Sequence, residues 1–392
     1  MADDFGLSAK PGYTPDVRFA LLGSIGRATN TFIVRFFLAL SVLSLAVVCL
    51  PTSGQKNSSL PSKVEATALL EASTRTINLW ASDSVPFHLH ATVKSYGQKA
   101  QVRRGTFDLW WVSPARFRDE INWGDKPSVR VGDKNTLWIE GSDAHRLDTF
   151  RITGLLGFAS RLAIPANESI DRVQAKKIKG VPVICVRLPE ASNSSGMDPL
   201  PGSGLFVIGS PVLGRSACLD ATTKLPVRID DGSHRLELGD YVQVGDKQFP
   251  RTLAELSRDG LPIVEMDLDL LEPLNVNGTN AFVVSAEATG KHWCANMILP
   301  RAAQLNFPPG LAYVSGGFIT TSPVGISSLL VFRVDETGHP ADVRAFTIAG
   351  EATISDHEKR ALLQSRFSPA TCDGKPLEAE FLFRDYPLQS HQ

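Results

Sequence analysis

The sequence lacks an excess of charge of either sign. Its 40 Lys and Arg residues nearly balance its 41 Asp and Glu residues, and the formal net charge is -1. A nucleic-acid-binding protein concentrates basic charge on one face, so this balance argues against that function. There is also no long run of like charge and no short-period repeat. The length of 392 residues predicts two folded domains plus a tail.

The sequence motifs of common enzyme classes are missing too. We find no phosphate-binding loop, no H-E-x-x-H and no dinucleotide fingerprint. The Gly-Ser-Gly at 202–204 lacks the spacing of a nucleophile elbow. We therefore expect a non-catalytic protein without a cofactor or a metal. Catalytic residues that are scattered in sequence and converge in space are the alternative.

Two sets of polar residues are candidate binding sites. His88 and His90 stand two residues apart on one predicted strand face, which would make half of a metal site. No third ligand is evident, so we interpret them as surface histidines. Glu265, Asp267 and Asp269 alternate with apolar residues, and we interpret them as the solvated face of a strand.

One hydrophobic segment does not fit a globular domain. Residues 36–50 carry no charge, follow Arg35 directly and precede small residues that end at Gly54. This arrangement is typical of a secretory signal, which is either cleaved after Gly54 or kept as a membrane anchor. We expect the rest of the chain in the periplasm, free or anchored to the inner membrane. The long stretch before the segment suggests Val34 as an alternative start.

The middle of the chain alternates with a period of two, as β-strands do. A helix with apolar residues at helical spacing is predicted over 64–80. The predicted strands are 87–93, 105–112, 116–123, 128–131, 135–140, 181–188, 216–219, 225–230, 234–242 and 263–270, with a short helix at 155–164. The tetrapeptide Val-Gly-Asp-Lys occurs at 131–134 and at 244–247, each time between alternating segments, and predicts two hairpin turns.

The end of the chain predicts a small α+β unit. Two strands at 329–334 and 341–347 flank a turn. Ser355 and Glu358 form a capping box, which predicts a helix over 356–365. Residues 377–383 alternate apolar and acidic side chains and predict a half-buried last strand.

The predicted fold class is α+β, with an antiparallel half-barrel β domain behind a leading helix and a small C-terminal α+β domain. The predicted divisions are a tail or mis-assigned start at 1–33, a signal peptide or anchor at 34–54, a linker at 55–63, the β domain at 64–275, a linker at 276–294 and the terminal domain at 295–387.

Four cysteines follow the hydrophobic segment: Cys185, Cys218, Cys294 and Cys372. Their number is even, the expected compartment is oxidising, and none forms a close pair that could hold zinc. We predict disulfides between Cys185 and Cys218 and between Cys294 and Cys372, because each bridge then lies within one predicted domain.

The terminal unit resembles the C-terminal domain of the TonB family of periplasmic energy transducers. The residues that carry the resemblance are 332–335, Gly338, 342–343, Gly350, 361–362, 366–370 and 373–376. The pattern fails over 299–328, and no His lies between 31 and 50, where the family's membrane helix carries one. We therefore expect a domain that binds proteins, and the sequence leaves open whether it couples energy.

The resemblance implies that the last strand binds an extended peptide of an envelope protein or outer-membrane receptor at its free edge. The candidate residues on this edge are Leu377, Ala379, Phe381 and Phe383. In the alternative, residues 299–328 fold back and pair with the edge.

The middle region resembles the periplasmic lipoprotein carriers of the LolA and LolB type. The resemblance rests on residues 105–107, 114–118, 131–134 and 137–139. It implies an incomplete barrel that covers an apolar cavity for a lipid or acyl chain. The candidate cavity residues are Phe107, Leu109, Trp111, Phe117, Ile121 and Trp123.

Two functions therefore compete. The first is a non-catalytic envelope protein that binds other proteins through its terminal domain, and the second is a carrier of apolar ligands. A filled half-barrel core favours the first, and an open apolar groove favours the second.

Overall fold

This computed structural model describes residues 60–97, 101–125, 127–141, 145–164, 169–188, 207–208, 215–230, 234–294, 297, 300–304, 329–347 and 349–384. The predicted export segment at 34–54 lies outside these residues. All described residues belong to one unit, residues 59–392. Among the helices that the structure describes, none is long and apolar enough to cross a membrane.

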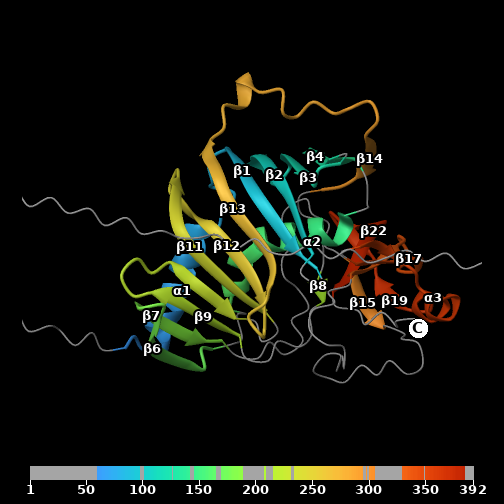
Figure 1. The fold of residues 1–392 in the computed structure, drawn as a ribbon. Helices are drawn as coiled ribbons and strands as arrows, with labels where there is room; N and C mark the ends of the chain where they lie inside the picture. Colours follow the sequence, from blue (N-terminus) through green and yellow to red (C-terminus); the bar gives the residue numbers. More distant parts are fainter. Residues whose placement is uncertain are drawn as a thin grey trace, which may run out of the picture. The chain divides into compact units, whose positions relative to one another are not determined.

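The largest element is an open antiparallel sheet of 13 strands made from two meanders (Figure 1). The first contains β1 (Phe87–Tyr96), β2 (Val102–Ser113), β3 (Arg116–Asn122), β4 (Ser128–Asp133) and β5 (Thr136–Glu140). The second contains β6 (Arg172–Ile178), β7 (Val181–Arg187), β9 (Ser216–Asp220), β10 (Pro226–Asp230), β11 (His234–Val244), β12 (Lys247–Ser257) and β13 (Pro262–Pro273). β1 pairs with β13, so the first and last strands of this region join the two meanders.

The predicted half-barrel with its period of two is confirmed, because buried and half-buried residues alternate along β1 without a break. Each copy of Val-Gly-Asp-Lys leads to a two-residue hairpin turn, but at different positions. The first copy ends β4, and Asp133 pairs with Thr136 across a turn at 134–135. The second copy spans its turn, with Val244 paired to Lys247. The first turn places Lys134 at a φ of 54°, and the second places Gly245 at 58°. These positive values are the left-handed conformation that such turns require.

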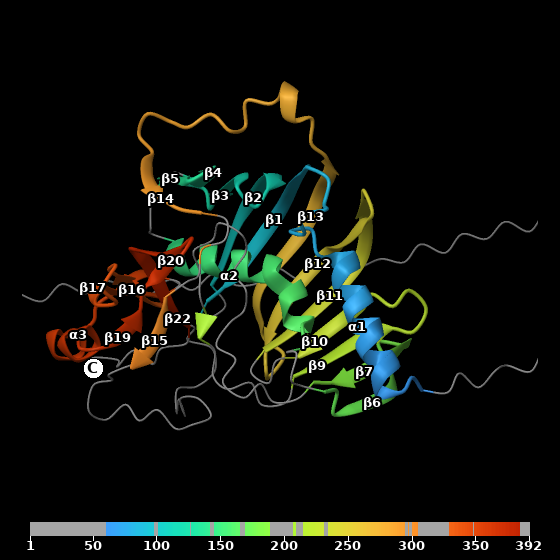
Figure 2. The same ribbon diagram turned by 180° about the vertical axis from the view of Figure 1, so that it is seen from behind.

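Two helical segments cover one face of the large sheet, as Figure 2 shows from behind. α1 (Lys63–Ile77) begins with a capping box of Ser62 and Glu65 and buries Ala66, Leu70 and Ile77 at helical spacing. α2 (Arg146–Leu156) continues into the 3-10 helix η3 (Gly157–Leu162). The predicted second helix at 155–164 therefore starts too late by about two turns, and β6 and β12 were not predicted at all.

The segment after β13 runs past the ends of the strands to the other edge of the sheet (Figure 1). It contains η4 (Val276–Gly278) and ends in β14 (Thr289–His292), which pairs with β5. Arg118 of β3 donates to the carbonyl oxygens of Ala281 and Val283 and so holds the segment against the sheet. The predicted linker at 276–294 is thus part of the half-barrel, because its last residues form the edge strand.

The C-terminal part contains a five-stranded sheet in the order β18-β17-β16-β22-β8. Its elements are β8 (Val207–Ile208), β16 (Leu329–Val334), β17 (Pro340–Thr347), β18 (Gly350–Ala352), α3 (Asp356–Leu363) and β22 (Ala379–Arg384). Two short antiparallel strand pairs accompany it: β15 (Arg301–Gln304) with β19 (Arg366–Ser368), and the hairpin of β20 (Ala370–Cys372) with β21 (Lys375–Leu377). The predicted strands, the helix and its capping box of Ser355 and Glu358 are confirmed.

This small sheet is buried on both faces. Phe332, Val343, Leu362 and Phe381 belong to a core on the side of α3. On the other face, Leu147 and Phe150 of α2 pack against Leu329, Val331, Phe346 and Leu382. Burial on both faces explains why β16 reads as a continuous apolar run instead of an alternating one.

The predicted disulfide pairing is confirmed. Cys185 and Cys218 are bonded across β7 and β9, where they are directly opposite each other. Cys294 is bonded to Cys372 of β20. Because Cys294 follows the edge strand β14, this second bridge ties the edge of the large sheet to the terminal unit instead of staying within one domain.

Candidate functional site at the junction of the two sheets

Helix α2 is the element that connects the large sheet with the small one. Its residues Ile152, Leu155 and Leu156 belong to the core of the half-barrel. Its first turns contribute Leu147 and Phe150 to the other core, which they share with β16, β17 and β22. An ion pair between Arg146 and Glu380 of β22 adds a polar contact at the same place. A helix that packs against two partners is buried on more than one side, as α2 is.

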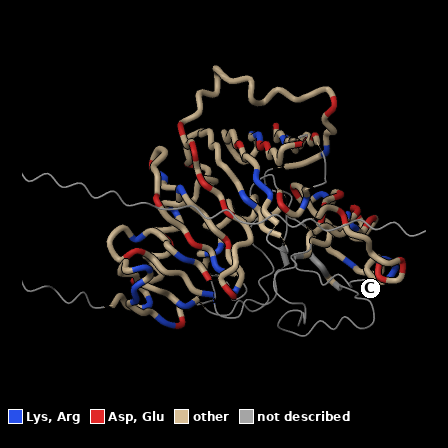
Figure 3. Tube along the Cα trace, in the orientation of Figure 1, with Lys and Arg blue, Asp and Glu red and all other residues tan. Residues whose placement is uncertain are grey.

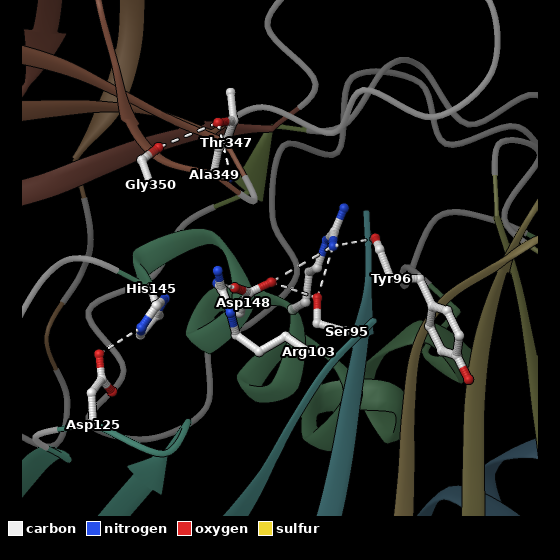
Figure 4. Close-up of polar contacts among 10 residues, drawn as sticks. Ser95, Tyr96, Arg103, Asp125, His145, Asp148, Thr347, Ala349 and Gly350 are labelled. Carbon is white, nitrogen blue, oxygen red and sulfur yellow. Dashed lines mark hydrogen bonds and ion pairs between the residues drawn. The ribbon is translucent and has the colours of Figure 1, made fainter. Parts of the chain in front are cut away.

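A buried polar cluster fixes α2 against β1 and β2 (Figure 4). The hydroxyl of Ser95 donates to the carboxylate of Asp148 over 2.5 Å, and Arg103 pairs with the same carboxylate. Arg151 donates to the Ser95 hydroxyl at 2.8 Å and to the carbonyl oxygen of Tyr96 at 3.0 Å. Asp148 and Ser95 are almost fully buried, at 1% and 0% exposure. Such a cluster is stable only when its charges are paired, so it specifies one position of α2.

A pocket of about 110 Å³ lies where β5, β14, α2 and β22 meet, and we call it the junction pocket. Its floor is apolar and comes from both sheets and from α2. The floor residues are Leu137, Ile139, Phe150, Trp293, Met297, Leu377 and Ala379. The volume is smaller than a typical site for a whole small molecule, which is roughly 300–1,000 Å³. The junction pocket therefore suits one apolar side chain or the end of a chain.

Charged side chains surround the junction pocket. Those on its rim are Arg130, Glu140, Arg146, Lys291, His292, Arg333, Glu378 and Glu380. Arg130 holds a two-point ion pair with Asp119, with N–O distances of 2.9 and 2.7 Å, and Arg333 lies 4.0 Å from Glu378. Basic and acidic positions are likewise mixed along the described strands of both sheets (Figure 3). A polar rim around an apolar floor is typical of a protein-binding anchor site.

The second disulfide supports the same pocket. Cys294, Ala370, Cys372 and Leu377 form a small buried cluster against which Met297 and Ala379 pack. Three of these residues, Leu377, Ala379 and Met297, also line the junction pocket. The covalent bridge thus holds the two walls of the pocket at a fixed separation.

Most of the predicted cavity residues are buried. Phe107, Leu109, Trp111, Phe117 and Ile121 are at most 4% exposed, and Trp123 packs on them as a half-buried residue. Trp111 contacts Trp80 with ring centroids 5.0 Å apart, and Phe117 contacts Trp293 at 5.7 Å. This burial fits plain core packing, the alternative to a cavity wall, and an apolar-ligand cavity at these residues stays a prediction. Trp80 and Trp293, which are distant in sequence, fill the space in front of these strands.

The predicted partner-binding edge is only partly free. β22 pairs with β16 on one side, and β8 pairs with it in parallel at Leu382 and Phe383 on the other. The expected open edge of β22 is therefore occupied at these two positions, by a strand for which no element was predicted from the sequence. Phe381 and Phe383 are buried in the core. Leu377 and Ala379, the other two candidate residues, line the junction pocket.

The paired histidines have a partner that sequence spacing did not reveal. Asp108 of β2 accepts hydrogen bonds from His88 at 3.1 Å and from His90 at 2.9 Å. Burial raises the pKa of Asp108, but the hydrogen bonds from His88 and His90 outweigh it, so the pKa lies below its ordinary value. Among the described residues, no group of three or more His, Cys, Asp or Glu side chains could hold a metal ion.

The residues that build the junction were mostly missed by sequence reasoning. Arg146, Asp148 and Phe150 lie before the predicted start of the second helix, and Lys291 and Trp293 lie in a predicted linker. A signal was present for the helix, because Leu147, Phe150, Ile152 and Leu155 are spaced for burial on more than one side. No local signal marks β14, because all four of its residues are exposed.

Comparison with known proteins gives only distant similarities. No family model matches the chain, and no curated protein matches it either. Similar solved structures include a putative outer membrane lipoprotein-sorting protein domain from Vibrio parahaemolyticus, with 11% identity and a TM-score of 0.33, which covers 56% of this chain and 97% of that one. A LolA superfamily protein from Nitrosomonas europaea has 9% identity and a TM-score of 0.35, and covers 54% and 94%.

A third solved structure covers a larger share of this chain. MucB has 14% identity and a TM-score of 0.32, and the match covers 78% of this chain and 99% of MucB. A complex of MucA and MucB from Pseudomonas aeruginosa also matches, with 14% identity and a TM-score of 0.24 over 77% of this chain and 91% of that one. These values are too low to assign a function. The comparisons give no support to the TonB resemblance of residues 295–387.

Proposed function

We propose that this chain is a non-catalytic binding protein of the bacterial cell envelope, which holds a segment of a partner protein by one apolar side chain in the junction pocket. The observation that carries the proposal is the pocket itself: an apolar floor of the size of one side chain, inside a rim of paired charges, between two sheets that a disulfide ties together.

The surroundings of the pocket favour a protein ligand. Anchor residues of protein interfaces sit in well-packed apolar pockets, and polar groups around them exclude water and orient the partner. Arg146 of α2 and Glu380 of β22 pair with each other and both line the pocket, so a ligand meets polar groups beside the apolar floor. The two disulfides support export to an oxidising compartment, where the hydrophobic segment at 36–50 would direct the chain.

Photocrosslinking in cells tests this proposal. A photoreactive residue at Lys291, on the rim, should yield a discrete crosslinked protein that mass spectrometry identifies. The same residue at Lys63, which is exposed at the start of α1, is the matched control and should not yield that product. Equal products from both positions, or no protein product from Lys291, would show that the junction pocket does not hold a protein partner.

A second candidate function is that of a periplasmic carrier of lipid or lipoprotein acyl chains. The observation in its favour is the apolar face of the large sheet, which α1 and α2 cover as separate helices (Figure 2). An acyl chain could enter only if a helix moved away, because Trp80 and Trp293 fill the space. Solvent extraction of the purified protein decides between the two candidates, because only a carrier should release a stoichiometric lipid.

A further inference from the structure

β10 and β11 separate from each other after a short paired region. They pair only between Arg228–Asp230 and Arg235–Glu237. β11 continues to Val244 and pairs with β12 on its far side up to that residue. Among the described residues, no strand pairs with the near side of β11 over 238–244. An unpaired strand edge of this length offers backbone N–H and C=O groups to another extended chain.

The sequence explains why the pairing stops there. Pro226 of β10 has no N–H to donate, so it cannot continue the ladder toward β11. Asp240 of β11 has a φ of 52° and does not appear in the register with β12. The hydroxyl of Tyr241 donates to the carbonyl oxygen of Pro226 at 2.7 Å. This side-chain bond crosses the gap at Tyr241, near the middle of 238–244, in place of a strand pair.

The gap opens into a groove of about 940 Å³, which we call the β10–β11 groove. Apolar side chains line it, among them Val181, Val227, Leu238 and Ala254. Val181, at the start of β7, is 41% exposed and so is accessible to a ligand in the groove. The volume lies within the range of roughly 300–1,000 Å³ that ligand sites occupy.

The charges around the β10–β11 groove are mainly negative. Its carboxylates are Asp220, Glu237, Asp240, Glu265 and Asp267, and its only basic side chains are Lys94 and Lys179. Lys94 binds Glu265 at 3.2 Å and Asp267 at 3.4 Å. Glu237 is bound by Lys179 at 2.8 Å and by Arg228, which does not line the groove, at 3.3 Å. Five carboxylates thus face three basic side chains. The groove therefore keeps an excess of negative charge, which favours a basic partner.

We infer that the β10–β11 groove binds an extended, basic peptide segment of a partner protein, which adds as a strand along 238–244 of β11. The backbone edge supplies the hydrogen bonds, and the apolar lining accepts a side chain from every second residue of the peptide. The carboxylates around the groove select Lys or Arg at the positions between. This site is distinct from the junction pocket and does not depend on it.

The probe that tests the inference is a short fluorescent peptide of alternating Lys and Val, compared with its Glu and Val counterpart on the full chain. We expect binding of the basic peptide only, with weaker binding at high salt because exposed charges are screened. Hydrogen exchange should show new protection of the amides in 238–244 when the peptide is bound.

Two Val→Arg variants provide the specificity control. Val181→Arg places a cation and a long side chain in the groove, whereas Val283→Arg changes a residue of similar type that is 65% exposed elsewhere. Binding of the basic peptide should weaken about tenfold or more in Val181→Arg and stay unchanged in Val283→Arg, a tenfold change being a clear loss of an interface contact.

Three results would overturn the inference. Equal binding of the basic and acidic peptides would show that the carboxylates of the groove do not select the ligand. Binding without protection of the amides in 238–244 would show that the peptide does not add as a strand to β11. A dimer in light scattering that Val181→Arg dissociates would mean that a second copy of the chain occupies the groove instead.

Discussion

Removing the charge of Asp148, in the buried polar cluster beneath α2, should strongly destabilise the protein. In Asp148→Asn, Arg151 stays buried, with its side chain 4% exposed, and loses the carboxylate that lies 3.8 Å from its guanidinium. Arg103, at 27% side-chain exposure, can turn toward water, so the cost arises mainly at Arg151. Removing one partner of a buried ion pair lowers the free energy of unfolding by about 3–5 kcal/mol.

The position of Asp148 predicts how the unfolding transition changes. Because α2 also carries Leu147 and Phe150, loosening it should uncouple the terminal unit from the half-barrel. Urea unfolding followed by tryptophan fluorescence and circular dichroism should therefore show a lower midpoint and a separate early transition.

The matched control is Asp125→Asn. Asp125 lies 2.8 Å from His145 near the start of the same helix, but its side chain is 49% exposed. Exposed pairs contribute about 0–1 kcal/mol, so this variant should unfold almost as the parent does. A loss below about 1 kcal/mol in Asp148→Asn, equal to the control, would refute the role of the buried cluster.

Three further predictions concern other parts of the chain. Replacing Cys294 and Cys372 together by Ser should lower the free energy of unfolding by about 4–5 kcal/mol, because the unfolded chain gains entropy without the bridge. The urea midpoint should fall accordingly, and an unchanged midpoint would show that the bridge does not stabilise the fold. Because folding lowers the pKa of Asp108, this residue stabilises the folded protein above its ordinary pKa of 3.8, and the stabilisation is lost as the pH falls through the lower, folded-state pKa. The free energy of unfolding of Asp108→Asn should therefore fall less than that of the parent below about pH 4. Parallel curves of unfolding free energy against pH for the two proteins would contradict this. Gly338→Ala should strongly destabilise the terminal unit, because Gly338 has a φ of 85° and the added Cβ would lie 2.0 Å from a backbone oxygen. Gly374→Ala should cost only about 1–3 kcal/mol of backbone strain, because Gly374 has a φ of 78° but open space around it. Equal melting temperatures of the two variants would contradict this distinction.

Features with short-range causes could be predicted from the sequence. The turns at 134–135 and 245–246 depend on residues within or directly after the tetrapeptide, and the capping box of Ser355 and Glu358 depends on a spacing of three. The cysteine pairing was also correct, although its stated reason held for only one bridge. Cys294 follows an edge strand of the large sheet, so its bond to Cys372 crosses between the two sheets.

Features with long-range causes could not be predicted in the same way. β14 joins β5 across more than 140 residues of chain, and β8 joins β22 across more than 170. Neither short strand has an alternating pattern of its own, because its position is set by the partner strand. The junction pocket depends on the pairing of β14 with β5, and only Leu377 and Ala379 of its residues were candidates from the sequence.

The binding of a partner segment in the junction pocket is tested most directly by filling the pocket. Ala379 lies on its floor, and Ala379→Trp should occupy the available 110 Å³, while Val64→Trp adds the same side chain at an 80% exposed position of α1. With a labelled peptide from the protein that crosslinks to position 291, fluorescence anisotropy should give a dissociation constant at least about tenfold higher for Ala379→Trp and an unchanged one for Val64→Trp. Equal affinities for the parent and Ala379→Trp, in a protein that melts normally, would contradict the proposed function.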